Sequence, residues 1–181
     1  FLSNYISLRP VRSLQMYPTV WCSGRNAVAR YNSVLVAHPG STLDVGARAV
    51  LEAEGARAEI VSRAITKGGH VSARGHLVGR VPGIHAHLEC RGLILSDEGS
   101  MLAVPELEGL ARDVDMSHEA AVGKIAEEEI RYLMARGMTG DEATSAIVRG
   151  FLDLEIKGLP AHLRQQMQRA IDQAQEGERL F

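Results

Sequence analysis

Apolar and polar residues alternate through most of the segment from Tyr31 to Leu95. Alternation places successive side chains on opposite faces, so each such run predicts a β-strand with one buried face. Turns that contain glycine, such as His38-Pro39-Gly40 and Gly68-Gly69, separate the runs about every 10 to 15 residues. No interval between the runs is long enough for a crossover helix, which excludes a doubly wound α/β fold. The pattern predicts a sandwich, a barrel or a solenoid.

The apolar positions of these runs are filled mainly by alanine, valine and isoleucine, and aromatic residues make up only 4% of the chain. Small and β-branched side chains suit stacked rungs, in which the same position recurs one layer above another. This composition favours a β-solenoid, although the rungs are irregular in length and show no repeat consensus. A sandwich or a barrel remains an alternative on these grounds.

After Met116 the spacing of apolar residues becomes helical. Ile125, Ile130 and Leu133 fall on one helical stripe that Gly137 is placed to end. Thr139-Gly140-Asp141-Glu142 has the form of a capping box and predicts a second helix.

A third helix is expected from Pro160 to about Ala174. We therefore expect a β-rich unit over residues 1–115 and a small helical unit over residues 116–181.

Composition narrows the possible functions. The 181 residues carry a formal net charge of -2, which argues against a nucleic-acid partner. No apolar run approaches the ~18 residues that a membrane span needs. Two cysteines, Cys22 and Cys90, cannot form a disulfide framework, so we expect a cytoplasmic protein. The first residue is Phe1 rather than methionine, which suggests part of a longer polypeptide.

Cys90 ends a run with three polar residues that could carry chemistry. In a strand, His85, His87 and Glu89 share one face, and Cys90 lies on the other with Ala86 and Leu88. Cys90 is then a small buried apolar residue, a thiolate ligand for a soft metal or iron–sulfur centre, or a nucleophile. No cysteine-protease signature surrounds it, which weakens the last alternative.

His118 and Glu119 lie where we expect the strands to give way to helices. Two adjacent residues cannot face the same way in regular structure, so we do not expect them to act as a pair. His118 is a metal ligand or a hydrogen-bonded junction residue. Ser117 is placed to cap the helix expected after it, and Glu119 to lie in its first turn.

Several short motifs follow one another in a specific order. Those in the first 115 residues include Tyr31-Asn32-Ser33-Val34, Ala64-Ile65-Thr66-Lys67-Gly68-Gly69, Glu89-Cys90-Arg91-Gly92 and Val104-Pro105-Glu106-Leu107. Those in the remainder include Ser117-His118-Glu119-Ala120-Ala121, Tyr132-Leu133-Met134-Ala135-Arg136-Gly137 and Val148-Arg149-Gly150-Phe151-Leu152. Over about residues 17–175 the chain resembles the SufB/SufD family, scaffold subunits of the SUF iron–sulfur cluster assembly machinery.

The resemblance implies a fold and a set of partners. The fold is a right-handed parallel β-helix followed by a small C-terminal helical unit. The chain would pair through its β-helix, either as a homodimer or as a SufB–SufD type heterodimer. It would not be an enzyme by itself, because the partner SufC, an ABC-type ATPase, would hydrolyse ATP. The resemblance places the ATPase-docking surface on the helices, with Ile147, Val148, Phe151 and Leu152 as the partner-binding residues.

The resemblance also implies a site for the cluster. Cys90 corresponds to the SufB cysteine proposed to hold the nascent cluster, and His118 to a histidine of both branches. Glu119 matches the SufB-type glutamate, so Cys90, His118 and Glu119 are the expected metal ligands. The cluster would be transient, of the [4Fe-4S] or [2Fe-2S] type, and a reduced flavin could take part.

Departures from the family pattern leave alternatives. No cysteine of this chain aligns with the additional SufB cysteine that receives sulfur. Either the sequence is a fragment, or sulfur delivery works differently. A separate alternative for the function is a SufD-like structural paralogue that binds the ATPase but holds no cluster. A β-helix enzyme acting on carbohydrate would need aromatic platforms, which the low aromatic content disfavours.

Overall fold

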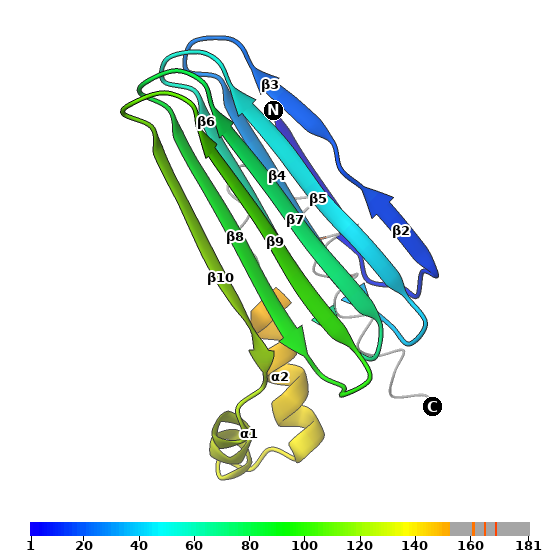
Figure 1. Cartoon of the computed structure of the whole chain (residues 1–181). Coiled ribbons are helices and arrows are strands. Elements are labelled where there is room, and N and C mark those ends of the chain that lie inside the picture. The colour runs from blue at the N-terminus through cyan, green and yellow to red at the C-terminus, as the bar shows by residue number, and fades with distance from the viewer. Residues whose placement is uncertain (153–160, 162–164, 166–168, 170–181) are drawn as a thin grey trace.

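The computed structural model describes residues 1–152 and residues 161, 165 and 169. The chain forms a parallel β-helix of two long sheets, followed by helices at one end (Figure 1). From β4 to β8, each strand pairs in parallel with the strand two positions further along the chain. The prediction of a mainly β solenoid is thereby confirmed. The alternatives of a sandwich and a barrel fall away, because both need antiparallel or closed pairing that the described strands lack.

The strands divide evenly between the two sheets. The first, sheet A, has the order β1-β4-β6-β8-β10, with bounds Leu2–Ser7, Val28–Ala37, Arg57–Thr66, His85–Ile94 and Asp115–Lys124. The second, sheet B, has the order β2-β5-β7-β9, and β3 also pairs with β5; the bounds of β2, β3, β5, β7 and β9 are Ser13–Met16, Thr19–Cys22, Thr42–Leu51, His70–Gly79 and Ser100–Gly109.

The core lies between the two sheets and is built from the inward half of each alternating strand. Ala29, Ala58 and Ala86 occupy matching register positions in three successive turns and are all buried. Because the same position recurs directly above itself, small side chains allow the two sheets to approach closely. The preference for alanine in the sequence is explained by this stacking.

Glycine shapes the turn that was predicted at His38-Pro39-Gly40. Gly40 has a φ of 77°, in the left-handed region that side chains rarely adopt. The turn closes when the amide of Ser41 donates a hydrogen bond to the carbonyl of His38 at 2.9 Å.

The β-helix extends further than the sequence pattern indicated. Residues from Met116 onward were expected to be helical, but β10 runs through Asp115–Lys124 and the first helix begins only at Glu127. The backbone amide of Asp115 donates to the carbonyl of Ile84 at 3.0 Å, and Met116 packs against the core. His118 and Glu119 therefore lie inside a strand, not at a strand–helix junction, and Ser117 caps no helix.

The two helices after β10 agree with the expected signals. Helix α1 spans Glu127–Met134, and Gly137 just beyond it has a φ of 98°, as a helix-ending glycine does. Helix α2 spans Gly140–Leu152. Its capping box is present, because the Thr139 amide donates to a Glu142 carboxylate oxygen at 2.8 Å and the Glu142 amide donates to the Thr139 hydroxyl at 3.3 Å. The third helix, expected over 160–174, lies almost wholly outside the described residues.

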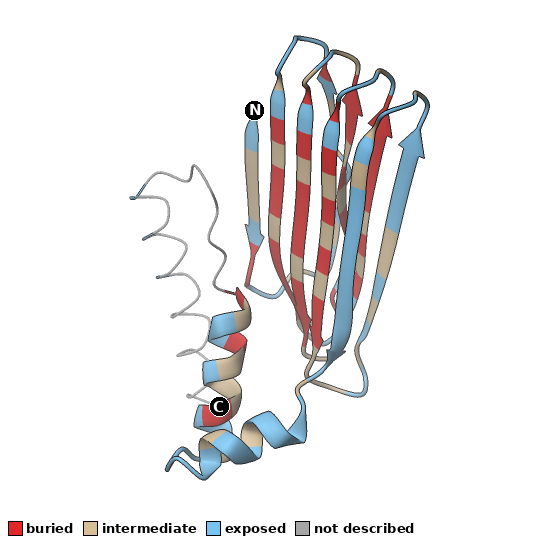
Figure 2. Cartoon of the chain, turned by 90° about the vertical axis from the view of Figure 1, so that its left-hand side faces the viewer, coloured by how far each residue is buried: buried red, intermediate tan, exposed pale blue. Residues whose placement is uncertain are grey.

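Helix α2 covers part of the outer face of sheet A (Figure 2). Val148 and Leu152 are 7% and 3% exposed and pack with Val61 and Ile65 of β6. These contacts cover the second half of the sheet and leave the first half, where the strands begin, open to solvent.

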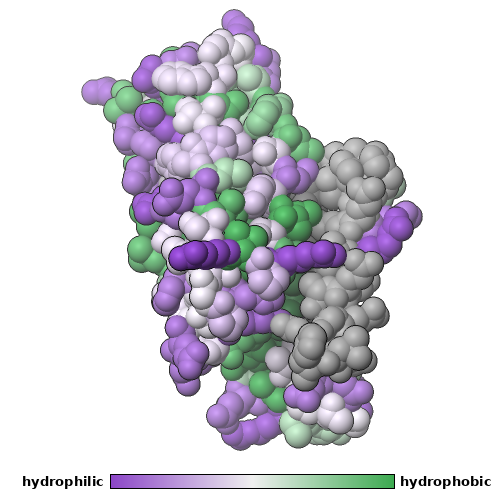
Figure 3. Space-filling view, turned by 90° about the vertical axis from the view of Figure 1, so that its right-hand side faces the viewer, coloured by the Kyte–Doolittle hydropathy of each residue, from purple (hydrophilic) through white to green (hydrophobic). Residues whose placement is uncertain are grey.

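The face opposite to that of Figure 2 mixes apolar and polar groups over the described residues. Figure 3, viewed from the side opposite to Figure 2, shows apolar groups dispersed among polar ones over the visible β-helix. Within the part of the chain that the structure describes, neither helix has the length and apolar character needed to cross a bilayer.

Candidate functional site

Cys90 lies inside the β-helix, on the inner face of β8. Its side chain is fully buried in a core cluster that also contains Leu88 and Ala86. On the outer face of the same strand, His87 and Glu89 are half-buried, as the alternation predicted. Ala120 of β10 lies beside Cys90 in the parallel ladder, so among the described strands β10 alone lies between Cys90 and this edge of sheet A.

Burial determines the protonation of this thiol. Loss of hydration raises the pKa of Cys90 from 9.0 to about 11, and the negative charge of Glu89 adds to the effect. At neutral pH Cys90 is therefore a protonated thiol. Binding to iron requires loss of that proton, so loading of a metal must include either deprotonation or an opening of the core.

The raised pKa predicts how stability changes in alkali. Above pH 9 the unfolded chain loses the Cys90 proton, whereas the folded chain keeps it up to about pH 11. The folded state then binds more protons, so the free energy of unfolding falls as the pH rises, by at most about 2.7 kcal/mol for this group. Urea denaturation between pH 8 and 11 should show this loss in the wild type but not in Cys90→Ser. Equal slopes for both proteins would contradict the shift.

The last two strands form an open end of the β-helix. The side chains of β9 and β10 are mostly exposed, as the pale blue strands in Figure 2 show. Among the described residues, each of these strands has a partner on one side only, β7 for β9 and β8 for β10. Such an edge presents unpaired backbone amides and carbonyls, to which another strand can form hydrogen bonds.

The two edges differ in their ability to pair. In a parallel ladder, successive residues direct their amides to opposite sides of the strand. In β9 the amide of Ser100 donates to the carbonyl of Gly69, just before β7, so Pro105 occupies a position that faces the free edge and blocks it. In β10 the amide of Asp115 faces β8, so the alternate residues from Met116 to Lys124 direct unpaired amides outward. No proline interrupts β10.

The three predicted ligands divide between the two faces of sheet A. His118 pairs in register with Leu88, and therefore shares the inner face with Cys90, but it is exposed because no further strand covers it. Glu119 pairs with Glu89 and lies on the outer face. The structure thus places Cys90 and His118 on one side of the sheet and Glu119 on the other.

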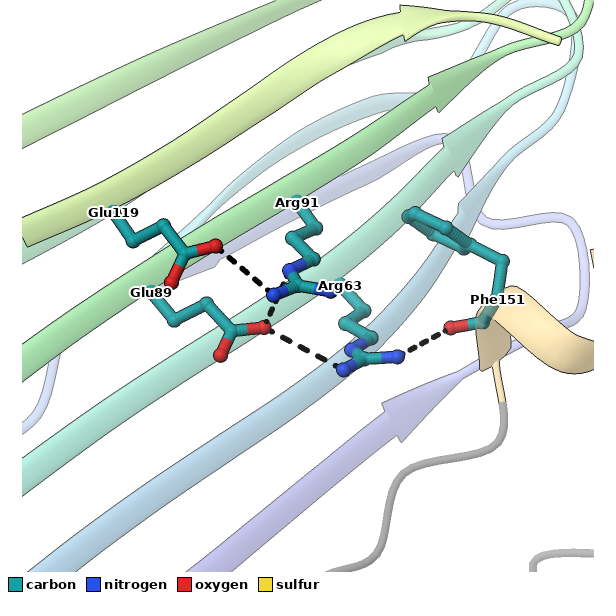
Figure 4. Close-up of polar contacts among 5 residues, drawn as sticks. All are labelled: Arg63, Glu89, Arg91, Glu119 and Phe151. Atoms are coloured by element: carbon teal, nitrogen blue, oxygen red, sulfur yellow. Dashed lines mark hydrogen bonds and ion pairs between the residues drawn. The ribbon is translucent and has the colours of Figure 1, made fainter.

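The outer face around Glu119 carries a chain of ion pairs, shown in Figure 4. A nitrogen of Arg91 lies 3.0 Å from Glu119 and another lies 3.0 Å from Glu89. Arg63 lies 3.5 Å from Glu89 and donates a hydrogen bond to the carbonyl of Phe151 at 2.9 Å. The network connects the end of α2 with the glutamate that the sequence singled out.

Sequence reasoning missed the surroundings of Glu119. One ligand atom from each of His87, Glu89 and Glu119 lies within 4.8 Å of the others. The alternation correctly placed His87 and Glu89 on one face of β8, but the register that brings Glu119 beside them has no local signal in the sequence.

The predicted partner-binding residues have unequal exposure. Val148 and Leu152 are buried against sheet A, whereas Ile147 and Phe151 are partly exposed. The neighbouring helix α1 has no buried residue, and Tyr132 is 58% exposed. An external partner could contact α1 and the exposed side of α2 without disturbing the contact between α2 and the sheet.

The fold and this site define a class of protein: a short parallel β-helix with an open end, a buried cysteine one strand from that end, and a helical appendage. The family model for the SUF system FeS cluster assembly SufBD core domain matches residues 11–151. The chain belongs to the SufBD family, and the prediction of that family is confirmed.

Curated relatives agree with this assignment. An iron-sulfur cluster assembly SufBD family protein of Archaeoglobus fulgidus is 55% identical over 97% of this chain and 47% of its own length. One from Methanothermobacter thermautotrophicus is 51% identical over 98% of this chain and 43% of its own length. One from Pyrococcus horikoshii is 33% identical over 98% and 40%, respectively. The chain thus spans less than half the length of these relatives.

Proposed function

We propose that this chain is a scaffold on which iron–sulfur clusters are assembled and from which they are transferred. The observation that carries the proposal is the position of Cys90, one strand from the unpaired edge of β10, in a member of the SufBD family. The cluster is the cargo of the scaffold. The chain itself is not an enzyme in this proposal.

The open edge supports pairing of two β-helices. The free amides and carbonyls of β10 can bond a strand of a second copy or of a sister subunit, which extends sheet A across the interface. Pairing places the inner faces of the two last turns next to one another. Cys90 of one chain is then close to the junction, with exposed His118 beside it on the same face.

The ligand chemistry fits a cluster that must later leave. Thiolate binds iron and sulfide well, and imidazole is a weaker companion. Cys90 and His118 from each of two chains would hold a cluster less firmly than four cysteines do. Glu119 remains a predicted ligand, but its place on the outer face separates it from Cys90 in the single chain.

Because Cys90 is buried, a cluster can form on it only after a conformational change, and we assign the driving of that change to the partner ATPase. Met101 and Met116 pack against the core cluster that contains Cys90, and methionine is a flexible cover. A rearrangement of the interface between the paired chains could displace these two methionines and expose the thiol. The family implies partnership with other SUF components, and we propose that SufC docks on α1 and the exposed side of α2 and drives the change.

Anaerobic reconstitution of the purified chain with ferrous iron and sulfide tests the function. We expect iron and sulfide to be retained after gel filtration in equal amounts, with the absorbance and Mössbauer spectra of a cluster. The alternative of a SufD-like paralogue is favoured by the full burial of Cys90. Retention of the ATPase in a pull-down by a chain that takes up no iron, alone or in the complex, would support that alternative and reject the scaffold.

A further inference from the structure

Three side chains with metal-binding atoms meet on the outer face of sheet A. His87 and Glu89 come from β8, and Glu119 comes from β10 in register with Glu89. One ligand atom of each lies within 4.8 Å of the others. We propose that His87, Glu89 and Glu119 bind a single divalent transition-metal ion. One imidazole and two carboxylates suit ferrous iron, manganese or zinc, and are too hard a set for a copper(I) site.

A contact with β10 restrains the imidazole of His87. Its Nδ1 lies 2.8 Å from the hydroxyl oxygen of Ser117, which occupies the matching register position in β10. When Nδ1 carries the proton, it donates a hydrogen bond to the Ser117 hydroxyl. The lone pair of Nε2 is then free to coordinate an ion. Metal-binding histidines are commonly fixed in this way by a hydrogen bond from the other ring nitrogen.

Arg91 bridges the two carboxylates while no ion is bound, and Arg63 also pairs with Glu89. Glu89 and Glu119 would repel one another at this distance, and Arg91 lies between them at 3.0 Å from each. The Arg91 side chain is 38% exposed and can turn into solvent, whereas Arg63 is anchored on the carbonyl of Phe151. A bound ion would displace Arg91 and neutralise the two carboxylates in its place.

A groove leads to the site from solvent. A cavity of about 260 Å³ follows the open half of the outer face of sheet A, and His87 and Ser117 belong to its lining. The lining carries charges of both signs, with Glu59 and Asp115 beside Arg30 and Arg57, so the groove contributes access rather than a net attraction for cations. The groove gives a divalent ion access without any opening of the core.

The site lies on the opposite face of β8 from Cys90. Glu89 and Cys90 are adjacent in the sequence and point to opposite sides of sheet A. The binding site itself rests on geometry, whereas the identification of its ion as ferrous iron destined for a cluster rests on the proposed function. In that case the outer face holds iron before the inner face receives it.

Titration of the purified chain with Co²⁺ in the absence of sulfide tests the site, read by the visible absorption of bound cobalt. We expect one Co²⁺ per chain. His87→Ala and Glu119→Gln should each weaken binding by at least about tenfold, since even the loss of an outer-shell partner costs that much. His85→Ala is the matched control, because His85 lies on the same face of β8 but pairs with Asp115 at 3.0 Å. It should bind as the wild type does.

Two further variants separate this inference from the cluster proposal. Cys90→Ser should bind Co²⁺ with unchanged affinity, and Arg91→Gln should bind it more tightly, because a competing cation is gone. A wild type that takes up no Co²⁺, or a folded His87→Ala protein with wild-type affinity, would overturn the metal site whatever the reconstitution shows. A chain that binds Co²⁺ through these residues but never retains sulfide would overturn the scaffold function alone.

Discussion

Cys90→Ala is expected to leave a folded chain that retains almost no cluster. If Cys90 supplies the only thiolate at the junction, its loss removes the ligand with the highest affinity for iron and sulfide. Iron and sulfide retained after anaerobic gel filtration should then fall by roughly tenfold or more. The fold should survive, because exchanging a thiol for a hydrogen leaves a small cavity that costs on the order of 1 kcal/mol.

Cys22→Ala is the matched control for this experiment. Cys22 is also a buried free cysteine, and it belongs to the same core cluster as Cys90. Both variants therefore lose one core sulfur, and only one loses the proposed ligand. Equal retention of iron and sulfide by the two variants would show that Cys90 is not a ligand of the cluster.

Much of the fold was readable from the sequence because a β-helix repeats its local rules. Alternation in the segment around His85, His87 and Glu89 gave the correct faces of β8, including the inward direction of Cys90. The small inward side chains and the regularly spaced turns that contain glycine indicated the stacked rungs of a solenoid. The helix signals at Gly137 and Thr139 were also local, since each depends on a few neighbouring residues.

The end of the β-helix was harder to read. Met116, His118 and Ala120 alternate with Ser117 and Glu119 in β10, but this strand is exposed on both faces and its inward positions include a histidine. Alternation of apolar and polar residues arises only where one face is buried, so an uncovered strand carries a weak signal. The sequence pattern therefore assigns this segment to the helical unit, whereas the structure shows it to be a strand.

The candidate site depends on register between residues far apart in sequence. Glu119 meets Glu89 because β10 lies directly beside β8, and Arg63 meets Phe151 because α2 folds back on sheet A. Neither contact follows from a local period. The division of the three predicted ligands between two faces is likewise a consequence of strand direction, which becomes known only when His118 and Glu119 are placed in a strand.

Val122→Pro is expected to abolish pairing of the β-helix while leaving the single chain folded. Val122 belongs to the alternate set of β10 residues whose amides face the free edge, so proline removes no bond to β8. β9 tolerates Pro105 in an equivalent position. Across an interface, however, proline deletes a ladder hydrogen bond and places its ring against the partner strand. The partner carbonyl that is left unpaired costs about 1–3 kcal/mol, and the steric clash of the ring adds to this. The lost hydrogen bond alone corresponds to roughly 5- to 150-fold weaker pairing.

Light scattering after gel filtration measures the effect on pairing with a second copy, and co-purification measures the effect on pairing with a sister subunit. Val122→Ala is the control, because it shortens the same side chain and keeps the backbone amide. We expect the alanine variant to pair like the wild type and the proline variant to remain a single chain with an unchanged circular dichroism spectrum. Wild-type pairing by the proline variant in both measurements would show that β10 is not the interface. The junction proposed beside Cys90 would then have to lie elsewhere, because of the two edge strands of sheet A, β1 and β10, only β10 is adjacent to the strand that carries Cys90.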